Sequence, residues 1–476
     1  MSGQQSFGKD RNERQWLLEN YQLLKKGAKA KFLEEEDYQS IIDYFNEEER
    51  FLDALEAVET GLGVFTFSAT LWIAKADVLV SLNRYREALD MLEETSFLDP
   101  MDIAVISLKT EILLALDRQE QAVALLETAL TSYEGDDKIH LLFELADVYD
   151  DYEAFEKVFD CLKWILEIDP EHEEALYKIC FWTDYTGRNE EGIQLHKSIL
   201  DEYPFNELAW FNLGAAYQGI RLYEKSIDAY QYAVAINDKF DYAYRNMGDA
   251  YIRLKKYREA IECLEKVSTL SLPEAVILEA IGFCYDKLND FAQARFHYRK
   301  ASHLNPEDAQ LIFKIAVTYL NQANWTQAQK HLESALAIHP MQPEFHLAMG
   351  RCLMAMGAWE DAMSHLGNVV RVRPKNKNGW MELLRCLYLG GLFDEGFEYA
   401  CMAFEQTESK PIFLCYQAAF MIALGQQKQA LHYLEVAFAS KPSLIRQFVD
   451  LDPSFLQITA VANLISRHKP VKRKKG

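Results

Sequence analysis

The sequence predicts an all-α fold in which helix-turn-helix hairpins stack into a solenoid, and three observations carry this prediction. The chain of 476 residues contains only 21 glycines and 12 prolines. These are about 4% and 2.5% of the chain, against roughly 7% and 5% in average proteins, so tight β-turns must be scarce. Hydrophobic residues make up 49% of the chain and charged residues 26%, which excludes a disordered chain. The third observation is a regular internal repeat.

The repeat is visible in the spacing of seven prolines. Each gap between successive members of this set is a multiple of 34, except that the first gap is longer by two. These prolines are Pro100, Pro170, Pro204, Pro306, Pro340, Pro374 and Pro442. Such self-similarity is typical of proteins in which each repeat is one supersecondary unit. The predicted units are 35–68, 69–102, 103–138, 139–172, 173–206, 207–240, 241–274, 275–308, 309–342, 343–376, 377–410 and 411–444.

Within each unit, two apolar stripes predict two helices. Positions 4, 7, 8 and 11 form one stripe with helical spacing, and positions 17, 20, 24 and 27 form another. Position 20 is Ala, Gly or Ser in eleven of the twelve units, and position 8 is small in most, so the two helices are expected to approach closely there. A turn near position 15 separates them, and proline at position 32 ends the second helix. One hairpin cannot bury both of its faces, so neighbouring hairpins must stack.

These residues resemble the tetratricopeptide repeat (TPR) family over about residues 35–444. Unit six matches the family pattern at Trp210, Leu213, Gly214, Tyr217, Tyr223, Tyr230 and Ala233. Unit eight matches it at Leu278, Ile281, Gly282, Tyr285, Phe291, Ala294, Tyr298, Ala301 and Pro306. Lys75 and Lys109 at position 7 depart from the pattern, and unit three lacks the proline. The resemblance implies a right-handed superhelix with a concave groove, lined by positions 2, 5, 9, 12 and 13, that binds protein or peptide segments.

The two ends are expected to act as caps, because terminal repeats otherwise expose an apolar face. Residues 1–34 are predicted to form a polar segment and a capping helix. Residues 445–467 are predicted to form capping helices, one of them opened by Asp452 and Pro453. Residues 468–476 are expected to be a disordered basic tail.

Composition also bears on location. The first residues lack the apolar core of a signal peptide, and the longest apolar run, 411–425, is too short to span a membrane. The eight cysteines are scattered, without a C-x-x-C pair, which favours reduced thiols over a disulfide framework or a zinc site. We therefore expect a cytoplasmic protein without membrane contact.

The sequence contains no recognisable catalytic motif, neither a zinc-protease signature nor a phosphate-binding loop nor a nucleophile elbow. Repeats and caps occupy almost the whole chain, so we expect a non-enzymatic protein-binding scaffold without cofactor or metal. Two alternatives stay open. The chain is a regulatory or substrate-docking subunit of a separate enzyme, or it is a hydrolase or transferase whose site the sequence does not reveal.

Charge is distributed unevenly along the chain. Residues 34–202 contain 42 acidic and 12 basic side chains, and the net charge of the whole chain is −23. This balance disfavours nucleic-acid binding, which requires an extended basic surface, and favours a basic partner. Six carboxylates occupy groove positions of units two to five and predict an acidic groove: Asp77, Glu111, Asp147, Asp150, Asp151 and Asp184.

We expect this groove to receive a segment that carries Lys or Arg, with Ile73 and Phe143 supplying apolar contact area. The segment belongs either to a partner protein or to the chain's own residues 472–475 in a homodimer. The alternative is an acidic surface that only solubilises the chain.

A second polar patch is predicted in units six and seven, at Asn212, Arg245, Asn246 and Arg253. It resembles the asparagine ladder and the carboxylate clamp of some relatives only in part. No unit pairs a basic residue at position 5 with Asn at position 9, so an adaptor for chaperone tails is disfavoured.

Overall fold

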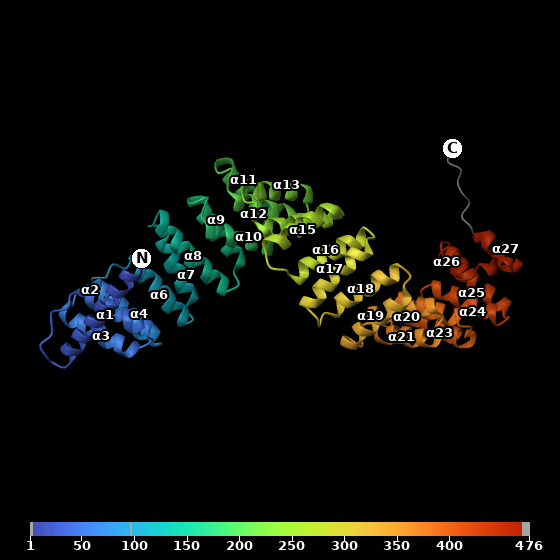
Figure 1. The fold of residues 1–476 in the computed structure, drawn as a ribbon, viewed down its shortest axis with the longest axis horizontal. Helices are drawn as coiled ribbons and strands as arrows, with labels where there is room; N and C mark the ends of the chain where they lie inside the picture. Colours follow the sequence, from blue (N-terminus) through green and yellow to red (C-terminus); the bar gives the residue numbers. More distant parts are fainter. Residues whose placement is uncertain (1–2, 96–97, 469–476) are drawn as a thin grey trace. The chain divides into compact units, whose positions relative to one another are not determined.

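The structure is a computed structural model that describes residues 3–95 and 98–468. Within these residues it contains 27 α-helices, one short 3-10 helix and no strand (Figure 1). The predicted all-α class, built from helix-turn-helix hairpins, is therefore confirmed. The chain divides into two compact units, residues 1–238 and 239–476.

The first compact unit contains thirteen helices within its described residues. They are α1 (Gly3–Lys25), α2 (Glu35–Glu47), α3 (Phe51–Val64), α4 (Ala69–Ser81), α5 (Tyr85–Glu94), α6 (Ile103–Ala115), α7 (Gln119–Ala129), α8 (Gly135–Asp151), α9 (Phe155–Ile168), α10 (Glu173–Tyr185), α11 (Asn189–Glu202), α12 (Glu207–Gly219) and α13 (Tyr223–Ile236).

The second compact unit continues the same alternation and ends in shorter elements. Its elements are α14 (Asp241–Arg253), α15 (Tyr257–Leu270), α16 (Ala275–Lys287), α17 (Phe291–Leu304), α18 (Ala309–Asn321), α19 (Trp325–Ile338), α20 (Pro343–Met356), α21 (Trp359–Val372), α22 (Lys377–Leu389), α23 (Phe393–Gln406), α24 (Ile412–Ala423), α25 (Gln427–Ser440), α26 (Leu444–Leu451), η1 (Pro453–Gln457) and α27 (Thr459–His468).

Twelve short turns, each joining two consecutive helices, contain a residue with positive φ. These residues are Glu49, Asn83, Asp117, Glu153, Gly187, Arg221, Lys255, Asn289, Ala323, Gly357, Gly391 and Gly425. Their numbers increase in steps of 34, with one step of 36 between Asp117 and Glu153. A left-handed residue at this point reverses the chain between the two helices of a hairpin. The boundaries of the twelve sequence units stay a prediction, which this spacing supports.

Small residues allow the two helices of a hairpin to touch. A Cβ atom added to Gly214 on α12 would lie 2.6 Å from Cε1 of Tyr230 on α13. The corresponding distance from Gly282 on α16 to Cδ1 of Tyr298 on α17 is 2.7 Å. Both tyrosines are buried, so neither ring can yield without repacking. The predicted close approach at position 8 is confirmed at these two hairpins.

Additional helices cover both ends of the series. Leu17 and Tyr21 of α1 are buried against the first hairpin, where the Tyr21 and Phe45 rings lie 6.3 Å apart. At the other end, the rings of Phe448 on α26 and Phe455 on η1 stack at 4.4 Å.

One detail of the C-terminal prediction is wrong. The Asp452 side chain accepts the Ser454 amide hydrogen, but it opens the 3-10 helix η1 rather than an α-helix, and α27 begins only at Thr459. The predicted basic tail begins inside α27, at His468, and its remaining residues, 469–476, lie outside the described residues. Among the helices that are described, none has both the length and the apolar character needed to cross a membrane. All eight cysteines are unpaired thiols.

Candidate interaction surface

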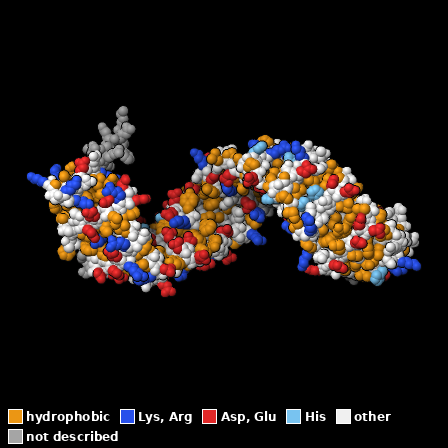
Figure 2. Space-filling view, turned by 90° about the horizontal axis from the view of Figure 1, so that it is seen from below, with side chains coloured by type: hydrophobic (Ala, Val, Ile, Leu, Met, Phe, Trp, Pro, Cys, Tyr) orange, Lys and Arg blue, Asp and Glu red, His pale blue; other side chains and the backbone are white. Residues whose placement is uncertain are grey.

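The six predicted acidic residues are exposed and lie on alternate helices of the first compact unit. Asp77 lies on α4, Glu111 on α6, Asp147, Asp150 and Asp151 on α8, and Asp184 on α10. Their exposure follows from the helical repeat, because the buried residues of each helix occupy other faces. We call these six residues, together with Asp43 on α2 and Glu174 on α10, the acidic face. Figure 2 shows carboxylates gathered in this part of the first unit, around α8 to α11.

At one end of the acidic face, three carboxylates form a row across α2, α4 and α6. Burial of the carboxylate raises the pKa of Asp77, and repulsion by Asp43 raises it further. Burial and then repulsion by Asp77 raise the pKa of Glu111 in the same way. Part of each side chain reaches solvent, yet the adjoining helices withdraw enough water to disfavour the charged form. No described cation opposes the rise in the pKa of Asp77 or of Glu111.

Asp43 escaped the sequence analysis, although it occupies position 9 of unit one, the same register as Asp77 and Glu111. The pKa of Asp43 is raised by burial and by Glu47, and lowered by Arg14. The hydrogen bond that reaches Asp77 is a long one, 3.5 Å from Asn46 Nδ2 to Asp77 Oδ2.

At the other end of the acidic face, a lysine lies among the carboxylates. Lys178 Nζ on α10 is 2.9 Å from Glu174 Oε1 and 4.0 Å from Asp147 Oδ1. The same ammonium lies 5.0 Å from the centre of the Phe143 ring. Burial raises the pKa of Asp147, which Lys178 opposes. Here the surface holds a cation between carboxylates and an aromatic ring, a combination that stabilises ammonium groups.

Asp150 and Asp151 lie near enough to Asp147 to raise its pKa by repulsion. Asp184 lies at the C-terminal end of α10 and forms no ion pair with any described residue. The structure therefore couples Glu111 electrostatically to Asp77, and Asp147 to Asp150 and Asp151.

Exposed aromatic rings also lie on α10. Tyr177, Phe181 and Tyr185 follow one another at intervals of four residues on α10, and each is more than half exposed, at 56%, 59% and 59%. The rings of Phe181 and Tyr185 stack with their centres 5.7 Å apart. The sequence analysis missed this row, although its residues occupy positions 5, 9 and 13 of unit five. Aromatic faces beside carboxylates suit the binding of Lys or Arg side chains.

The second predicted patch is corrected at one residue. Asn212 on α12 is buried, and its Nδ2 donates a hydrogen bond of 2.7 Å to the Leu176 carbonyl on α10. Its amide is thus committed to packing between these two helices, and it does not face a partner. The sequence alone does not show whether a polar residue at position 6 is buried between helices or exposed to solvent.

The other members of this patch belong to the second compact unit. Arg245 forms an ion pair of 2.5 Å with Glu274, and Arg253 Nε lies 3.5 Å from Asp249 on the same helix. Asn246 is half-buried. Both arginines therefore have carboxylate partners within the chain, which reduces what they offer to a ligand.

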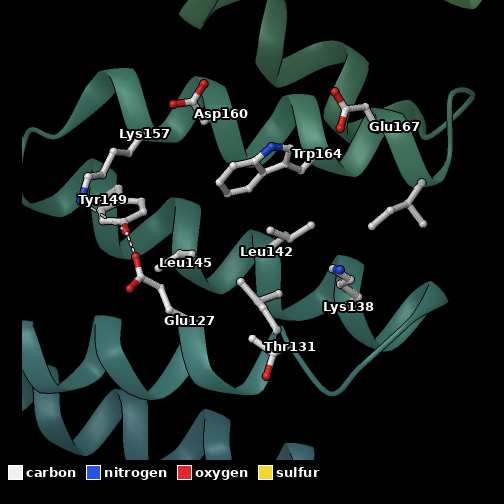
Figure 3. A pocket seen from close by; sticks show the side chains of 12 residues that line it. Glu127, Thr131, Lys138, Leu142, Leu145, Tyr149, Lys157, Asp160, Trp164 and Glu167 are labelled. Atoms are coloured by element: carbon white, nitrogen blue, oxygen red, sulfur yellow. Dashed lines mark hydrogen bonds between the residues drawn. The ribbon is translucent and has the colours of Figure 1, made fainter.

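A cavity of about 700 Å³ lies between α7, α8 and α9. Figure 3 shows Trp164, Leu142 and Leu145 along its middle, with Lys138 and Lys157 toward opposite ends. The described residues contain no group of three or more His, Cys, Asp or Glu side chains arranged to hold a metal ion.

Comparison with known families identifies TPR-type repeats. Residues 217–347 match the family model described as the C-terminal ARM domain of tetratricopeptide repeat protein 21. Residues 322–381 match the tetratricopeptide repeat model. No curated protein matches the sequence.

Several solved structures are similar to the chain at low identity. The Cut9–Hcn1 hetero-tetramer of APC/C contains a chain 13% identical, with 84% of this chain and 90% of that one covered and a TM-score of 0.35. The C-terminal part of a TPR protein from Cytophaga hutchinsonii is 14% identical, with 54% and 99% covered and a TM-score of 0.44. YrrB, described as a TPR protein with an unusual peptide-binding site, is 17% identical, with 39% and 95% covered and a TM-score of 0.35.

Proposed function

The chain is a tetratricopeptide-repeat protein, and from that premise we propose that it is a non-enzymatic scaffold whose acidic face binds a basic segment of a partner protein. TPR repeats commonly mediate contacts between proteins, and the acidic face offers two features that suit a basic ligand. No described cation opposes the rise in the pKa of its Asp77, and its exposed rings on α10 provide contact area. A reducing compartment such as the cytoplasm suits the eight free thiols.

The observation that carries this proposal is the position of Lys178. Its ammonium contacts Glu174 and lies over the Phe143 ring, so the surface already accommodates a lysine of the chain itself. A partner's Lys or Arg is expected to use the exposed carboxylates of Asp150 and Asp151 and the exposed rings of α10 in the same way. Opposite charges then accelerate encounter, and the rings slow dissociation.

The test uses the full chain and a fluorescent peptide that carries four Lys or Arg residues. Asp147, Asp150 and Asp151 are replaced together by Asn. The expected result is an association rate at least tenfold lower and a weaker dependence of that rate on salt. The control replaces Glu395, Glu398 and Glu405 of α23 by Gln, which changes the net charge equally on exposed positions of the second unit. Equal rates for the two triple variants would contradict the proposal.

A second arm tests the aromatic row. Replacing Phe181 by Ala should leave the association rate nearly unchanged and increase the dissociation rate, because the ring contributes contact area rather than charge. An unchanged dissociation rate would limit the ligand contact to the carboxylates.

The docking-subunit alternative makes a different prediction. An enzyme should then copurify with the chain in fixed ratio and leave it when the acidic face is neutralised. The homodimer alternative predicts a concentration-dependent sedimentation coefficient that the triple Asn variant abolishes. If neither occurs and the basic peptide binds as expected, the proposal of a separate basic partner stands; if the peptide does not bind, the acidic surface only solubilises the chain.

A further inference from the structure

One face of α17, in the second compact unit, gathers basic side chains. Arg295, Arg299, Lys300 and His303 follow at helical spacing, and no Asp or Glu occurs anywhere in this helix. Together with Tyr319 of α18, they line an open pocket of about 440 Å³. The pocket lies in the half of the chain in which basic side chains outnumber acidic ones, 29 against 24 in residues 239–476.

The two arginines of this cationic pocket are held in place by neutral groups. Arg295 lies over the Tyr319 ring at 4.4 Å and donates to Gln322 Oε1 at 2.7 Å. Arg299 Nη2 donates to the Tyr319 hydroxyl at 2.8 Å. These contacts orient the guanidinium groups but leave several N–H donors unused, because a guanidinium has five.

Neither the two arginines nor Lys300 forms an ion pair within the part of the chain that the structure describes. Other arginines of this protein differ, since Arg188 contacts Asp160 and Glu191, each at 2.7 Å. The charge on the cationic pocket is therefore uncompensated by the fold.

Burial and the positive charge of the pocket lower the pKa of two neighbouring histidines. Burial lowers the pKa of His331, whose ring stacks on Tyr319, and repulsion by Arg299 lowers it further. Burial and then Lys300 lower the pKa of His297. The protonated form of both imidazoles is therefore disfavoured, so neither ring readily adds to the charge of the pocket.

We propose that the cationic pocket on α17 binds a phosphoryl group carried by a segment of a partner protein. A phosphorylated side chain has a charge near −1.5 to −2 at neutral pH and three acceptor oxygens. It can accept hydrogen bonds from both arginines and Lys300 together, and guanidinium groups bind phosphate through paired N–H donors. A single carboxylate has one charge and two oxygens, so it satisfies fewer of these donors.

This site is independent of the acidic face, because it lies in the other compact unit and selects the opposite charge. Its ligand need not be the basic partner. The two proposals can fail independently, because the first is tested by binding of a basic peptide and the second by binding of a phosphoserine peptide.

The test measures binding of the full chain to three versions of one short peptide built from Gly and Ala. The central residue is phosphoserine, serine or aspartate. We expect the phosphoserine peptide to bind at least tenfold more tightly than the other two.

The double variant Arg299→Gln/Lys300→Gln should lose that preference. The single variant Arg299→Lys should retain part of the affinity, because it keeps the charge without the paired donors. The control, Lys428→Gln/Lys441→Gln, removes two exposed charges elsewhere in the second unit and should bind like wild type.

Inorganic phosphate provides a test that needs no variant. It should displace the phosphoserine peptide from wild-type protein at concentrations at which chloride does not. Equal affinity for the aspartate peptide would show a general acidic-peptide surface and overturn the proposal. Binding to phosphatidylserine vesicles without binding to the phosphopeptide would overturn it too, as would full affinity in the double variant.

Discussion

Residues 1–238 carry 49 acidic and 21 basic side chains, whereas residues 239–476 carry 24 and 29. The two compact units nevertheless use the same hairpin, with Gly214 against Tyr230 in the first and Gly282 against Tyr298 in the second. The comparison teaches that buried positions determine the fold and exposed positions determine the ligand. One architecture thus carries an acidic face and a cationic pocket.

The strongest test of this comparison replaces the glycines at the two matched contacts. Gly214→Leu and Gly282→Leu should each lower the free energy of unfolding by about 1–3 kcal/mol or more, because a buried tyrosine ring must move. Hydrogen exchange should show the loss first in the mutated hairpin and its neighbours, since repeats couple to adjacent repeats. The comparison breaks if only one substitution destabilises the chain, or if protection falls evenly along it.

The second test compares two buried histidines, one in each compact unit, that differ in their hydrogen-bond partners. His196 in the first unit has no partner for either ring nitrogen among the described residues. In the second unit, His346 Nε2 donates to the Pro340 carbonyl at 2.8 Å, and its Nδ1 lies 2.8 Å from His365 Nδ1. His346→Leu should cost about 1–3 kcal/mol because it removes two hydrogen bonds, each of which contributes about 0.5–1.5 kcal/mol, whereas His196→Leu should be neutral or stabilising. Denaturant unfolding measures both, and equal losses would contradict this distinction.

The pH dependence of stability provides a third test. Burial lowers the pKa of His196 to about 3, whereas an unfolded histidine titrates near 6.5. The folded state therefore binds this proton less tightly, so stability is full above about pH 6.5 and falls as the pH drops toward 3. His196→Leu should flatten the stability profile between these values. Identical slopes in variant and wild type would show that other groups account for acid sensitivity.

The smallest expected effect concerns the carboxylate row. The pKa of Asp77 is raised in the folded state, so stability falls as the pH rises from the ordinary carboxyl range through this raised pKa. Asp77→Asn should raise stability at pH 7 by about 0.5 kcal/mol, in the range of surface-charge optimisation, and have no such effect at pH 3. Glu395→Gln in the second unit is the control. A loss of stability at pH 7 would show that Asp77 is paired rather than repelled.

The sequence predicted the hairpins because the same packing demands recur in every repeat. It also predicted which carboxylates are exposed, since position 9 lies off the buried stripe. It did not predict that Asn212 would turn inward to the Leu176 carbonyl, because that contact joins residues 36 apart in sequence on different helices. The cationic pocket was missed for a related reason. Tyr319, which orients its arginines, comes from the following hairpin.

The left-handed turns have a consequence for how such a chain can evolve. Eight of the twelve positive-φ residues carry a side chain, and the five that are not Asn or Asp have a conformational penalty of about 1–2 kcal/mol that glycine would avoid. None of the eight belongs to the acidic face or to the cationic pocket. Substitutions at these turn residues can therefore raise or lower the stability of the chain without changing the residues that bind ligands. Such a chain can acquire a destabilising but useful surface in one hairpin and compensate for it in the turn of another.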